Sequence, residues 1–153
     1  MSDKHTHVNI NHATRPGSDD MTYKNVIEQI QKDNVCPFCP DQLAKYHKKP
    51  ILREGSFWTV TTNMYPYPNT KHHFLMILKA HKADSKDLSP EEWTELHDHI
   101  NWLVTSYNIP GGTFFMRCGD TSLTGATVTH LHSHFVSADF ENPNRKPIMA
   151  RVG

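Results

Sequence analysis

Near the C-terminal end of the chain, histidine alternates with other side chains over a segment of strand length. Residues 128–136 are Val-Thr-His-Leu-His-Ser-His-Phe-Val, so that His130, His132 and His134 stand two positions apart. Successive side chains of a β-strand point to opposite faces of the sheet, and residues two apart lie about 6.6 Å from each other on one face. We therefore predict a strand that presents three imidazoles to one site.

Other parts of the sequence predict further strands and two helices. Short apolar or alternating runs, separated by turn residues, predict strands at residues 51–54, 57–61, 73–78 and 113–117. Apolar residues at helical spacing predict a short helix from Tyr23 to Asn34, with Asp19 or Asp20 available as its cap. Ser89-Pro90-Glu91-Glu92 is typical of a helix start and precedes a long amphipathic helix that runs to Tyr107. The expected fold class is α+β, with a mainly antiparallel sheet and a long helix and short helices packed on it.

The length and the charge of the chain limit the kinds of partner. With 153 residues, 37% of them hydrophobic, the chain suits one domain at residues 21–153, preceded by a polar, flexible arm at residues 1–20 of which little function is expected. Sixteen basic side chains balance sixteen acidic ones, so we expect no extended nucleic-acid binding and no membrane partner. No signal or spanning segment is evident, and a cytoplasmic location is the default expectation.

Two of the three cysteines form a Cys-x-x-Cys motif, Cys36-Pro37-Phe38-Cys39. In a reducing compartment this spacing favours metal or redox chemistry over a structural disulfide. Cys118 has no obvious partner in the sequence and is expected to be a packed thiol.

The three alternating histidines have both a functional and a structural interpretation. The chain contains 12 histidines, and pairs such as His72–His73 or His97 and His99 are expected to be solvent-exposed. The alternating trio differs from them because Gly125 and Thr127 precede it, in a loop able to turn backbone N–H groups toward an anion. We therefore favour a functional site.

This segment resembles the signature of the histidine triad family, His-x-His-x-His preceded by Gly-x-Ser/Thr-Val-x. The resemblance extends to Asn63-Met64-Tyr65-Pro66-Tyr67 and to residues 73–81, which are similar to the Asn-x-x-Pro and Gly-His-x-x-x-x-Pro-x-x-His region of that family. Cys36-Pro37-Phe38-Cys39 resembles the Cys-x-x-Cys of zinc-bearing members, of the diadenosine polyphosphate hydrolase type. Together these motifs span residues 36–136.

The resemblance implies a nucleotide hydrolase or transferase that cleaves at a nucleotide α-phosphate. In this family the middle histidine, here His132, is the nucleophile that forms a nucleotidyl-histidine intermediate, a role that a neutral imidazole suits near pH 7. His134 then faces the phosphate as a hydrogen-bond donor, and Thr127 and the N–H groups near Gly125 stabilise its charge. Asn63 matches the position that reaches the ribose. The implied substrate is a purine nucleotide or dinucleotide, of diadenosine polyphosphate or nucleoside phosphoramidate type, and many relatives are homodimers.

The resemblance also implies a metal site. Zinc-bearing relatives use the cysteine pair, a histidine after the apolar strand and the first histidine of the triad, here Cys36, Cys39, His81 and His130. Two thiolates and two imidazoles form a closed tetrahedral set, which suits a structural Zn2+. Packed cysteines and a surface His81 are the alternative interpretation.

Departures from the family pattern leave the leaving group open. Ser133 replaces an apolar residue, Ala126 replaces a frequent glutamine, and Arg117 either meets polyphosphate charge or is an exposed strand residue. Two rival functions also remain: a metallohydrolase that uses all three triad histidines as ligands of a catalytic metal, and a nucleotide-binding protein that has lost turnover.

Overall fold

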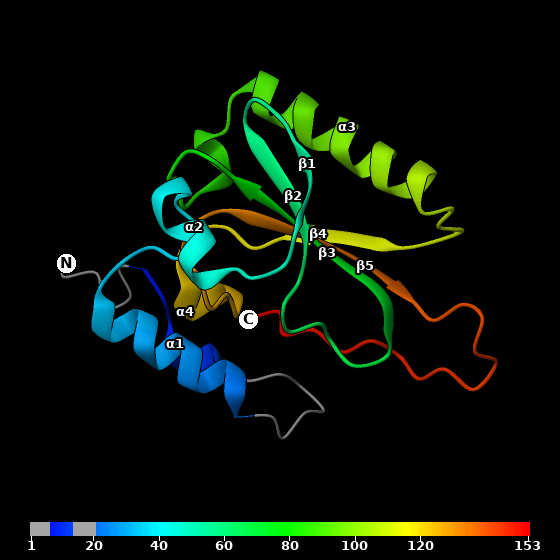
Figure 1. Cartoon of the computed structure of the whole chain (residues 1–153), viewed down its shortest axis with the longest axis horizontal. Helices are drawn as coiled ribbons and strands as arrows, with labels where there is room; N and C mark the ends of the chain where they lie inside the picture. Colours follow the sequence, from blue (N-terminus) through cyan, green and yellow to red (C-terminus); the bar gives the residue numbers. More distant parts are fainter. Residues whose placement is uncertain (1–6, 14–20) are drawn as a thin grey trace.

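A five-stranded antiparallel sheet forms the centre of the molecule in the computed structural model, which describes residues 7–13 and 21–153 (Figure 1). The strands are β1 (Ile51–Glu54), β2 (Trp58–Thr62), β3 (Thr70–Leu78), β4 (Thr113–Met116) and β5 (His132–Ala138), and their order across the sheet is β1-β2-β3-β5-β4. Each neighbouring pair is antiparallel. The predicted fold class is confirmed.

In the described part of the chain, four α-helices and two 3-10 turns surround the sheet. The helices are α1 (Thr22–Asp33), α2 (Pro40–Tyr46), α3 (Pro90–Ser106) and α4 (Thr121–Thr124), and the turns are η1 (Ile10–His12) and η2 (Ser85–Asp87). The capping box predicted for α3 is present, since Ser89 and Glu92 bond reciprocally to each other's backbone N–H. At its C-terminal end α1 stops at Asn34, which is left-handed with φ of 51°. The predicted caps Asp19 and Asp20 lie outside the described residues, and the sequence did not indicate α2 or α4.

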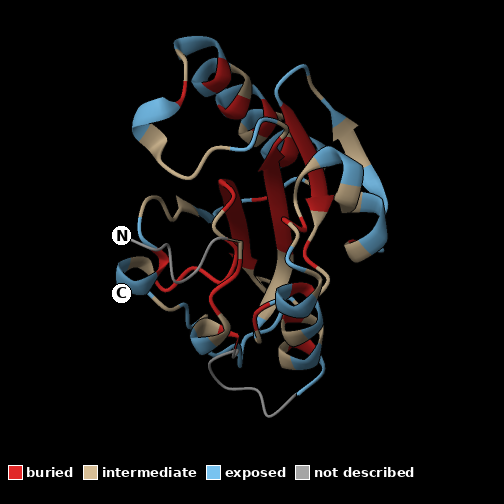
Figure 2. Ribbon diagram, turned by 90° about the vertical axis from the view of Figure 1, so that its left-hand side faces the viewer, coloured by how far each residue is buried: buried red, intermediate tan, exposed pale blue. Residues whose placement is uncertain are grey.

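The two faces of the sheet have different roles. Alternate residues of β2 and β3 point toward α3 and form the main core, which is built from Trp58, Val60, Phe74, Met76, Leu78, Leu96, Leu103 and Leu131. In Figure 2 the central strands are accordingly the buried part of the molecule. The opposite face carries His132 and His134, which pair with Ile77 and Leu75 of β3. Figure 1 shows α1 on this second side, away from α3.

The last strand is shorter than predicted at its N-terminal end. Residues 128–131 were expected to belong to it, but β5 begins at His132. The backbone before it bonds instead to the N-terminal segment: Thr129 N–H donates to the His7 carbonyl, and Val8 forms an isolated antiparallel bridge with Val128. His130 therefore leaves the face that His132 and His134 share.

Residues 7–13 are the described part of the predicted N-terminal arm. Val8, Asn9 and Ala13 are buried, and Val8 and Ala13 belong to a second apolar cluster with Ile27 and Val128. This segment lies against the loop that leads into β5, so it contributes to the surroundings of the histidines. Whether residues 1–20 form a unit separate from residues 21–153 stays a prediction.

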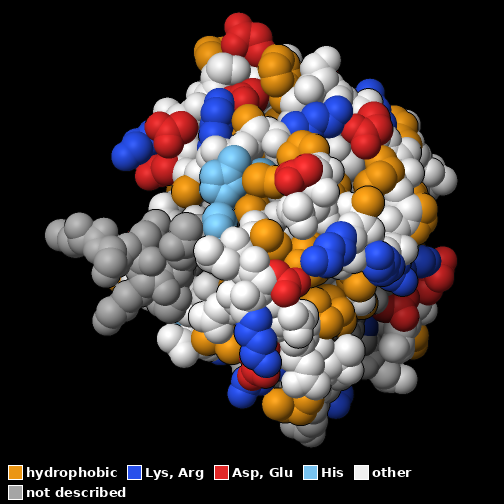
Figure 3. All heavy atoms as spheres, turned by 60° about the vertical axis from the view of Figure 1, so that its left-hand side comes forward, with side chains coloured by type: hydrophobic (Ala, Val, Ile, Leu, Met, Phe, Trp, Pro, Cys, Tyr) orange, Lys and Arg blue, Asp and Glu red, His pale blue; other side chains and the backbone are white. Residues whose placement is uncertain are grey.

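Within the described parts of the chain, no helix combines the length and the apolar character needed to cross a membrane. On the face shown in Figure 3, basic and acidic side chains are interspersed. The balanced composition is thus also visible in the distribution of charge on this face.

A single carboxylate holds the turn between β1 and β2. Glu95 of α3 accepts hydrogen bonds from the backbone N–H groups of Ser56, Phe57 and Trp58, at 3.0, 2.9 and 2.8 Å. The turn needs Gly55, because a Cβ there would lie 2.0 Å from Glu95 Oε1. Burial opposes ionisation of Glu95, but the hydrogen bonds from the Phe57 and Trp58 amides and from His99 outweigh it and lower its pKa.

We expect Glu95→Ala to lower the free energy of unfolding by about 2 kcal/mol at pH 7, because three amides lose a charged acceptor. Urea denaturation measures this loss, with exposed Glu91→Ala as the control on the same helix. Because the pKa of Glu95 is lower in the folded than in the unfolded state, its ionised carboxylate stabilises the fold at any pH above the ordinary carboxyl pKa. This contribution is lost as the pH falls through the lowered pKa of the folded state. The difference in the free energy of unfolding between wild type and Glu95→Ala should therefore become smaller in acid. A decrease of less than about 0.5 kcal/mol in the free energy of unfolding at pH 7 would contradict the role given to Glu95.

Candidate active site and metal-binding cluster

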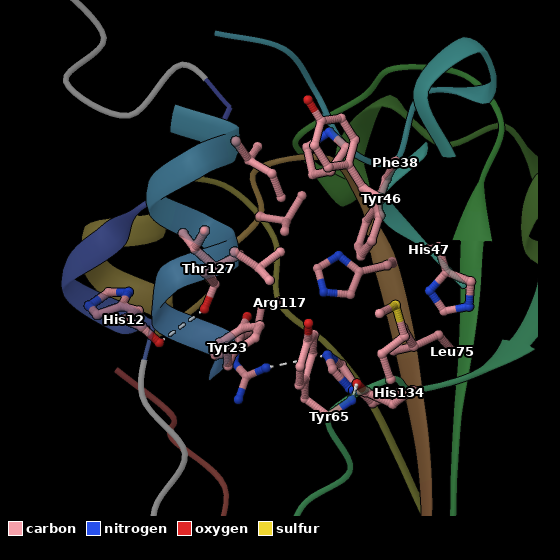
Figure 4. Close-up of a pocket in the computed structure, with 18 of the residues that line it drawn as sticks. His12, Tyr23, Phe38, Tyr46, His47, Tyr65, Leu75, Arg117, Thr127 and His134 are labelled. Carbon is pink, nitrogen blue, oxygen red and sulfur yellow. Dashed lines mark hydrogen bonds between the residues drawn. The ribbon is translucent and has the colours of Figure 1, made fainter. Parts of the chain in front are cut away.

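The histidine face of the sheet forms one wall of a solvent-open pocket (Figure 4). Apolar and aromatic side chains line one part, among them Tyr23, Val26, Ile27, Ile30, Phe38, Tyr46 and Tyr65. Polar side chains from β4, β5 and the surrounding loops line the rest, and they include His132, His134, Asn63, Thr127 and Arg117. The sequence-predicted nucleotide-binding residues are thus brought together.

His132 is held by the backbone of its own chain segment. Its Nδ1 lies 2.8 Å from the carbonyl oxygen of His130, and this oxygen can only accept. The proton of the neutral imidazole therefore resides on Nδ1, and the lone pair resides on Nε2. The ring of Phe38 packs edge-on against the His132 ring, with centroids 4.9 Å apart. These contacts fix the ring in the form and orientation that a nucleophile needs.

His134 is connected to a second buried histidine that β3 contributes. His73 Nε2 lies 2.9 Å from His134 Nδ1, and the backbone N–H of Tyr67 donates to His73 Nδ1 at 3.0 Å. The ring of Phe115 stacks on His134 at 4.7 Å between centroids. His73 was expected to be solvent-exposed; this is wrong, because the alternation of side chains along β3 turns His73 to the pocket side of the sheet, where it is buried.

The other predicted nucleotide-binding residues lie in the pocket wall with partners of their own. Asn63 is buried, accepts the backbone N–H of Tyr65 through Oδ1, and places Nδ2 at 3.2 Å from His73 Nε2. The hydroxyl of Thr127 donates to the carbonyl of His12 at 3.0 Å. The hydroxyl group therefore has to rotate away from the N-terminal segment before it can donate a hydrogen bond to a phosphate oxygen.

Gly125 begins the loop before β5, in a left-handed conformation with φ of 73°. The C-terminal segment also approaches it closely, since a Cβ at this position would lie 2.6 Å from the Cγ atom of Arg151. Both the backbone angle and the close contact require glycine here.

The four predicted metal ligands form a compact cluster. The ligand atoms of Cys36, Cys39, His81 and His130 all lie within 4.8 Å of one another. His130 Nδ1 is 3.4 Å from the Cys36 sulfur and 3.2 Å from His81 Nδ1, and the Cys39 sulfur is 3.3 Å from His81 Nδ1. Ligand atoms around a tetrahedral zinc ion are roughly 3.3–3.8 Å apart, given bond lengths near 2.0–2.3 Å. The cluster therefore fits such an ion.

The protonation of His130 also suits metal binding. Its Nε2 faces the carbonyl oxygen of Leu78, so this nitrogen carries the proton and Nδ1 points a lone pair into the cluster. Burial lowers the pKa of His130 to about 4, against the opposing effect of the Leu78 hydrogen bond. Burial also raises the pKa of the Cys36 thiol to about 12. A bound cation would supply the positive charge that stabilises the thiolates.

The arrangement separates the three triad histidines into two groups. Only His130 belongs to the metal cluster found among the described residues, whereas His132 and His134 face the pocket. The rival hypothesis, in which all three histidines bind one catalytic metal, does not match this geometry.

Several pocket residues could not be identified from the sequence. His12, His47, Tyr67 and Arg151 line the pocket, and they come from the N-terminal segment, the end of α2, the loop before β3 and the C-terminal tail. No local motif marks any of them, and only their positions in the fold bring them together. His99 was also expected to be exposed; this is wrong, since α3 turns it inward next to Glu95 and it is buried.

Comparison with known families identifies the protein class. The sequence model of the family described as "Scavenger mRNA decapping enzyme C-term binding" matches residues 36–150. The chain belongs to this family. Its fold is that of the histidine triad (HIT) proteins, in agreement with the resemblance seen in the sequence. A search of curated proteins found no match.

Solved structures of other HIT proteins share the fold. A "Hit Like Protein" is 22% identical, with a TM-score of 0.52, and the match covers 74% of this chain and 98% of that one. A HIT family hydrolase from Clostridium thermocellum is 22% identical with a TM-score of 0.53, covering 67% and 90%. A histidine triad nucleotide-binding protein from Candida albicans is 18% identical with a TM-score of 0.52, covering 71% and 81%. At these identities the likeness concerns the fold.

Proposed function

We propose that this HIT protein is a nucleotide hydrolase or nucleotidyltransferase that works through a covalent nucleotidyl-His132 intermediate. The observation that carries the proposal is the hydrogen bond from His132 Nδ1 to the His130 carbonyl, which leaves the lone pair of the ring on Nε2 at the pocket. The proposed substrates are purine nucleotides or dinucleotides, of diadenosine polyphosphate or nucleoside phosphoramidate type.

The proposed reaction has two displacement steps at phosphorus. His132 Nε2 attacks the α-phosphorus and forms an N–P bond, while the bond from phosphorus to the leaving group breaks and the leaving group departs with the electron pair and takes up a proton. Water or another acceptor then attacks the same phosphorus and gives up its proton to the solvent, the N–P bond breaks with its electron pair returning to Nε2, and His132 regains its starting form. The acceptor in the second step decides between hydrolysis and transfer.

Neighbouring groups are proposed to support this chemistry. His134 donates a hydrogen bond to the phosphate, and the loop from Gly125 to Thr127 stabilises charge on the non-bridging oxygens. Asn63 is proposed to bind the ribose through its side-chain amide. The aromatic and aliphatic part of the pocket, near Phe38 and Ile27, suits a nucleobase.

His132→Ala should abolish both turnover and covalent labelling while the fold persists, because the imidazole of His132 forms the bond to phosphorus. Wild-type protein is incubated with α-labelled adenine and guanine nucleotides, and intact mass at mildly alkaline pH reports a gain of one nucleotidyl group. The matched control is His97→Ala, which removes an exposed histidine from α3.

Three outcomes would reject this mechanism. Full activity of His132→Ala would exclude His132 as the nucleophile. Binding of AMP with no turnover of dinucleotides or phosphoramidates would instead support the non-catalytic rival. Chelator inhibition without any covalent adduct would support a metallohydrolase, which the geometry of the three histidines does not favour.

We further propose that Cys36, Cys39, His81 and His130 bind a structural zinc ion. The cluster contains two thiols and two imidazoles, a set that closes a tetrahedral shell and leaves no position for substrate. When bound, the ion would link α2 and the segment before it to the ends of β3 and β5. The residues that act on phosphate are separate from this set.

Protein purified without a tag or chelator should contain about one zinc per chain, measured by elemental analysis. Cys39→Ser should reduce this below half and should also lower the melting temperature, since metal binding stabilises the folded state. Cys118→Ser is the matched control, because Cys118 is not part of the cluster. Equal zinc content in the two variants would argue against the site.

The homodimer and the cytoplasmic location stay predictions. Trp93 and Val104 on α3 are 42% and 37% exposed, so these two apolar side chains are accessible in the single chain. Light scattering would decide the oligomeric state.

A further inference from the structure

Arg117 follows β4 and extends its guanidinium across the pocket to the third histidine of the triad. The guanidinium carbon lies 4.9 Å from the centre of the Phe115 ring. Nε donates to the carbonyl oxygen of Arg151 at 3.0 Å, and Nη2 donates to the same oxygen and, at 3.2 Å, to the hydroxyl of Tyr67. The remaining nitrogen, Nη1, lies 3.5 Å from His134 Nε2. Figure 4 shows Arg117 and His134 at the same end of the pocket.

A relay of hydrogen bonds decides the protonation of His134. The backbone N–H of Tyr67 can only donate, so His73 Nδ1 must accept and the proton of His73 resides on Nε2. That proton is directed at His134 Nδ1, 2.9 Å away, which must therefore accept. Asn63 Nδ2, which is also a donor, makes no hydrogen bond to His73 Nε2 in this state. The proton of neutral His134 then resides on Nε2.

Two donors consequently point into one small region of the pocket. His134 Nε2–H and the N–H groups of Arg117 Nη1 lie side by side at 3.5 Å, a spacing in which one donor cannot bond to the other. An oxygen with negative charge, placed between them, would accept from both. The geometry is that of a binding site for an anionic oxygen.

The charge of the pocket agrees with an anionic ligand. Of the described residues that line it, two are arginines, Arg117 and Arg151, and none is an aspartate or glutamate. Phe38 packs on His132, whereas Arg117 approaches His134, the next histidine along β5. A nucleoside that packs beside Phe38 would place its α-phosphate at His132 and its further groups toward Arg117.

We propose that Arg117 binds a phosphate of the leaving group, so that the protein prefers nucleotides whose leaving group is itself a phosphate or a nucleoside phosphate. The C-terminal tail prepares this site, since the Arg151 carbonyl and the Tyr67 hydroxyl hold the guanidinium in place. Nucleoside phosphoramidates have no phosphate beyond the one attacked and do not use this contact. The inference rests on the proposed function, because it assumes attack at the α-phosphate.

The test compares two substrates that share the adenylyl group, diadenosine tetraphosphate and adenosine 5′-phosphoramidate. In Arg117→Met, the ratio of kcat/KM for the tetraphosphate to kcat/KM for the phosphoramidate should fall by about 10- to 100-fold, the range for loss of a hydrogen bond to a charged group. Arg117→Lys keeps the charge without the fork of donors and should give an intermediate ratio. Arg53→Met, which removes an arginine on β1, is the matched control and should leave the ratio unchanged.

A binding measurement separates this proposal from the proposed function. Calorimetry with ADP and AMP should show that wild type binds ADP more tightly, and that Arg117→Met loses this advantage by the same factor, whether or not His132 forms an adduct. An equal fall in kcat/KM for both substrates in Arg117→Met would overturn the proposal that Arg117 binds the leaving group. An unchanged ratio of the two kcat/KM values, together with an unchanged preference for ADP over AMP, would overturn it as well. Thermal unfolding of each variant shows whether the substitution has displaced the C-terminal tail. If Arg117→Met has displaced the tail, the kcat/KM ratio of Arg117→Lys is used instead to test the proposal.

Discussion

The antiparallel pairing of β3 with β5 is the interaction on which the rest of the site depends. Its register sets His134 opposite Leu75 and His132 opposite Ile77, and it brings His73 within 2.9 Å of His134. The same pairing joins the end of β3 to the segment before β5, which is where His81 and His130 meet. One ladder of backbone hydrogen bonds thus aligns both the pocket-facing histidines and two of the four candidate metal ligands.

Backbone atoms also decide which nitrogen of each histidine carries the proton. Carbonyl oxygens face His132 Nδ1 and His130 Nε2, and the amide of Tyr67 faces His73 Nδ1. Because a carbonyl can only accept and an amide can only donate, the fold fixes one tautomer in each case. Three chemically identical side chains are therefore suited to the three tasks proposed for them: His130 to metal binding, His132 to nucleophilic attack, and His134, through its contact with His73, to donating a hydrogen bond to phosphate.

The elements with a strong local pattern could be predicted from the sequence. The capping box at Ser89 and the apolar run of strand length at residues 73–78 depend on neighbouring residues only, and both the capping box and a strand at these residues are confirmed. Helix α2, in contrast, has seven residues and no helix-period apolar run, and the start of β5 moved to His132 because residues 7–9 bond to the backbone before it. Contacts between segments more than 100 residues apart leave no trace in a local pattern.

The sequence by itself determined the chemistry that is available: which histidines alternate, which cysteines stand three positions apart, and that a flexible glycine precedes the strand. Only the tertiary structure decided how these groups are divided, with His130 turned to the cysteines and Arg117 turned to His134 by the tail carbonyl of Arg151. The physical reason is that side-chain identity and spacing fix faces and possible ligands, whereas protonation, burial and mutual distance depend on which backbone groups the folded chain brings alongside.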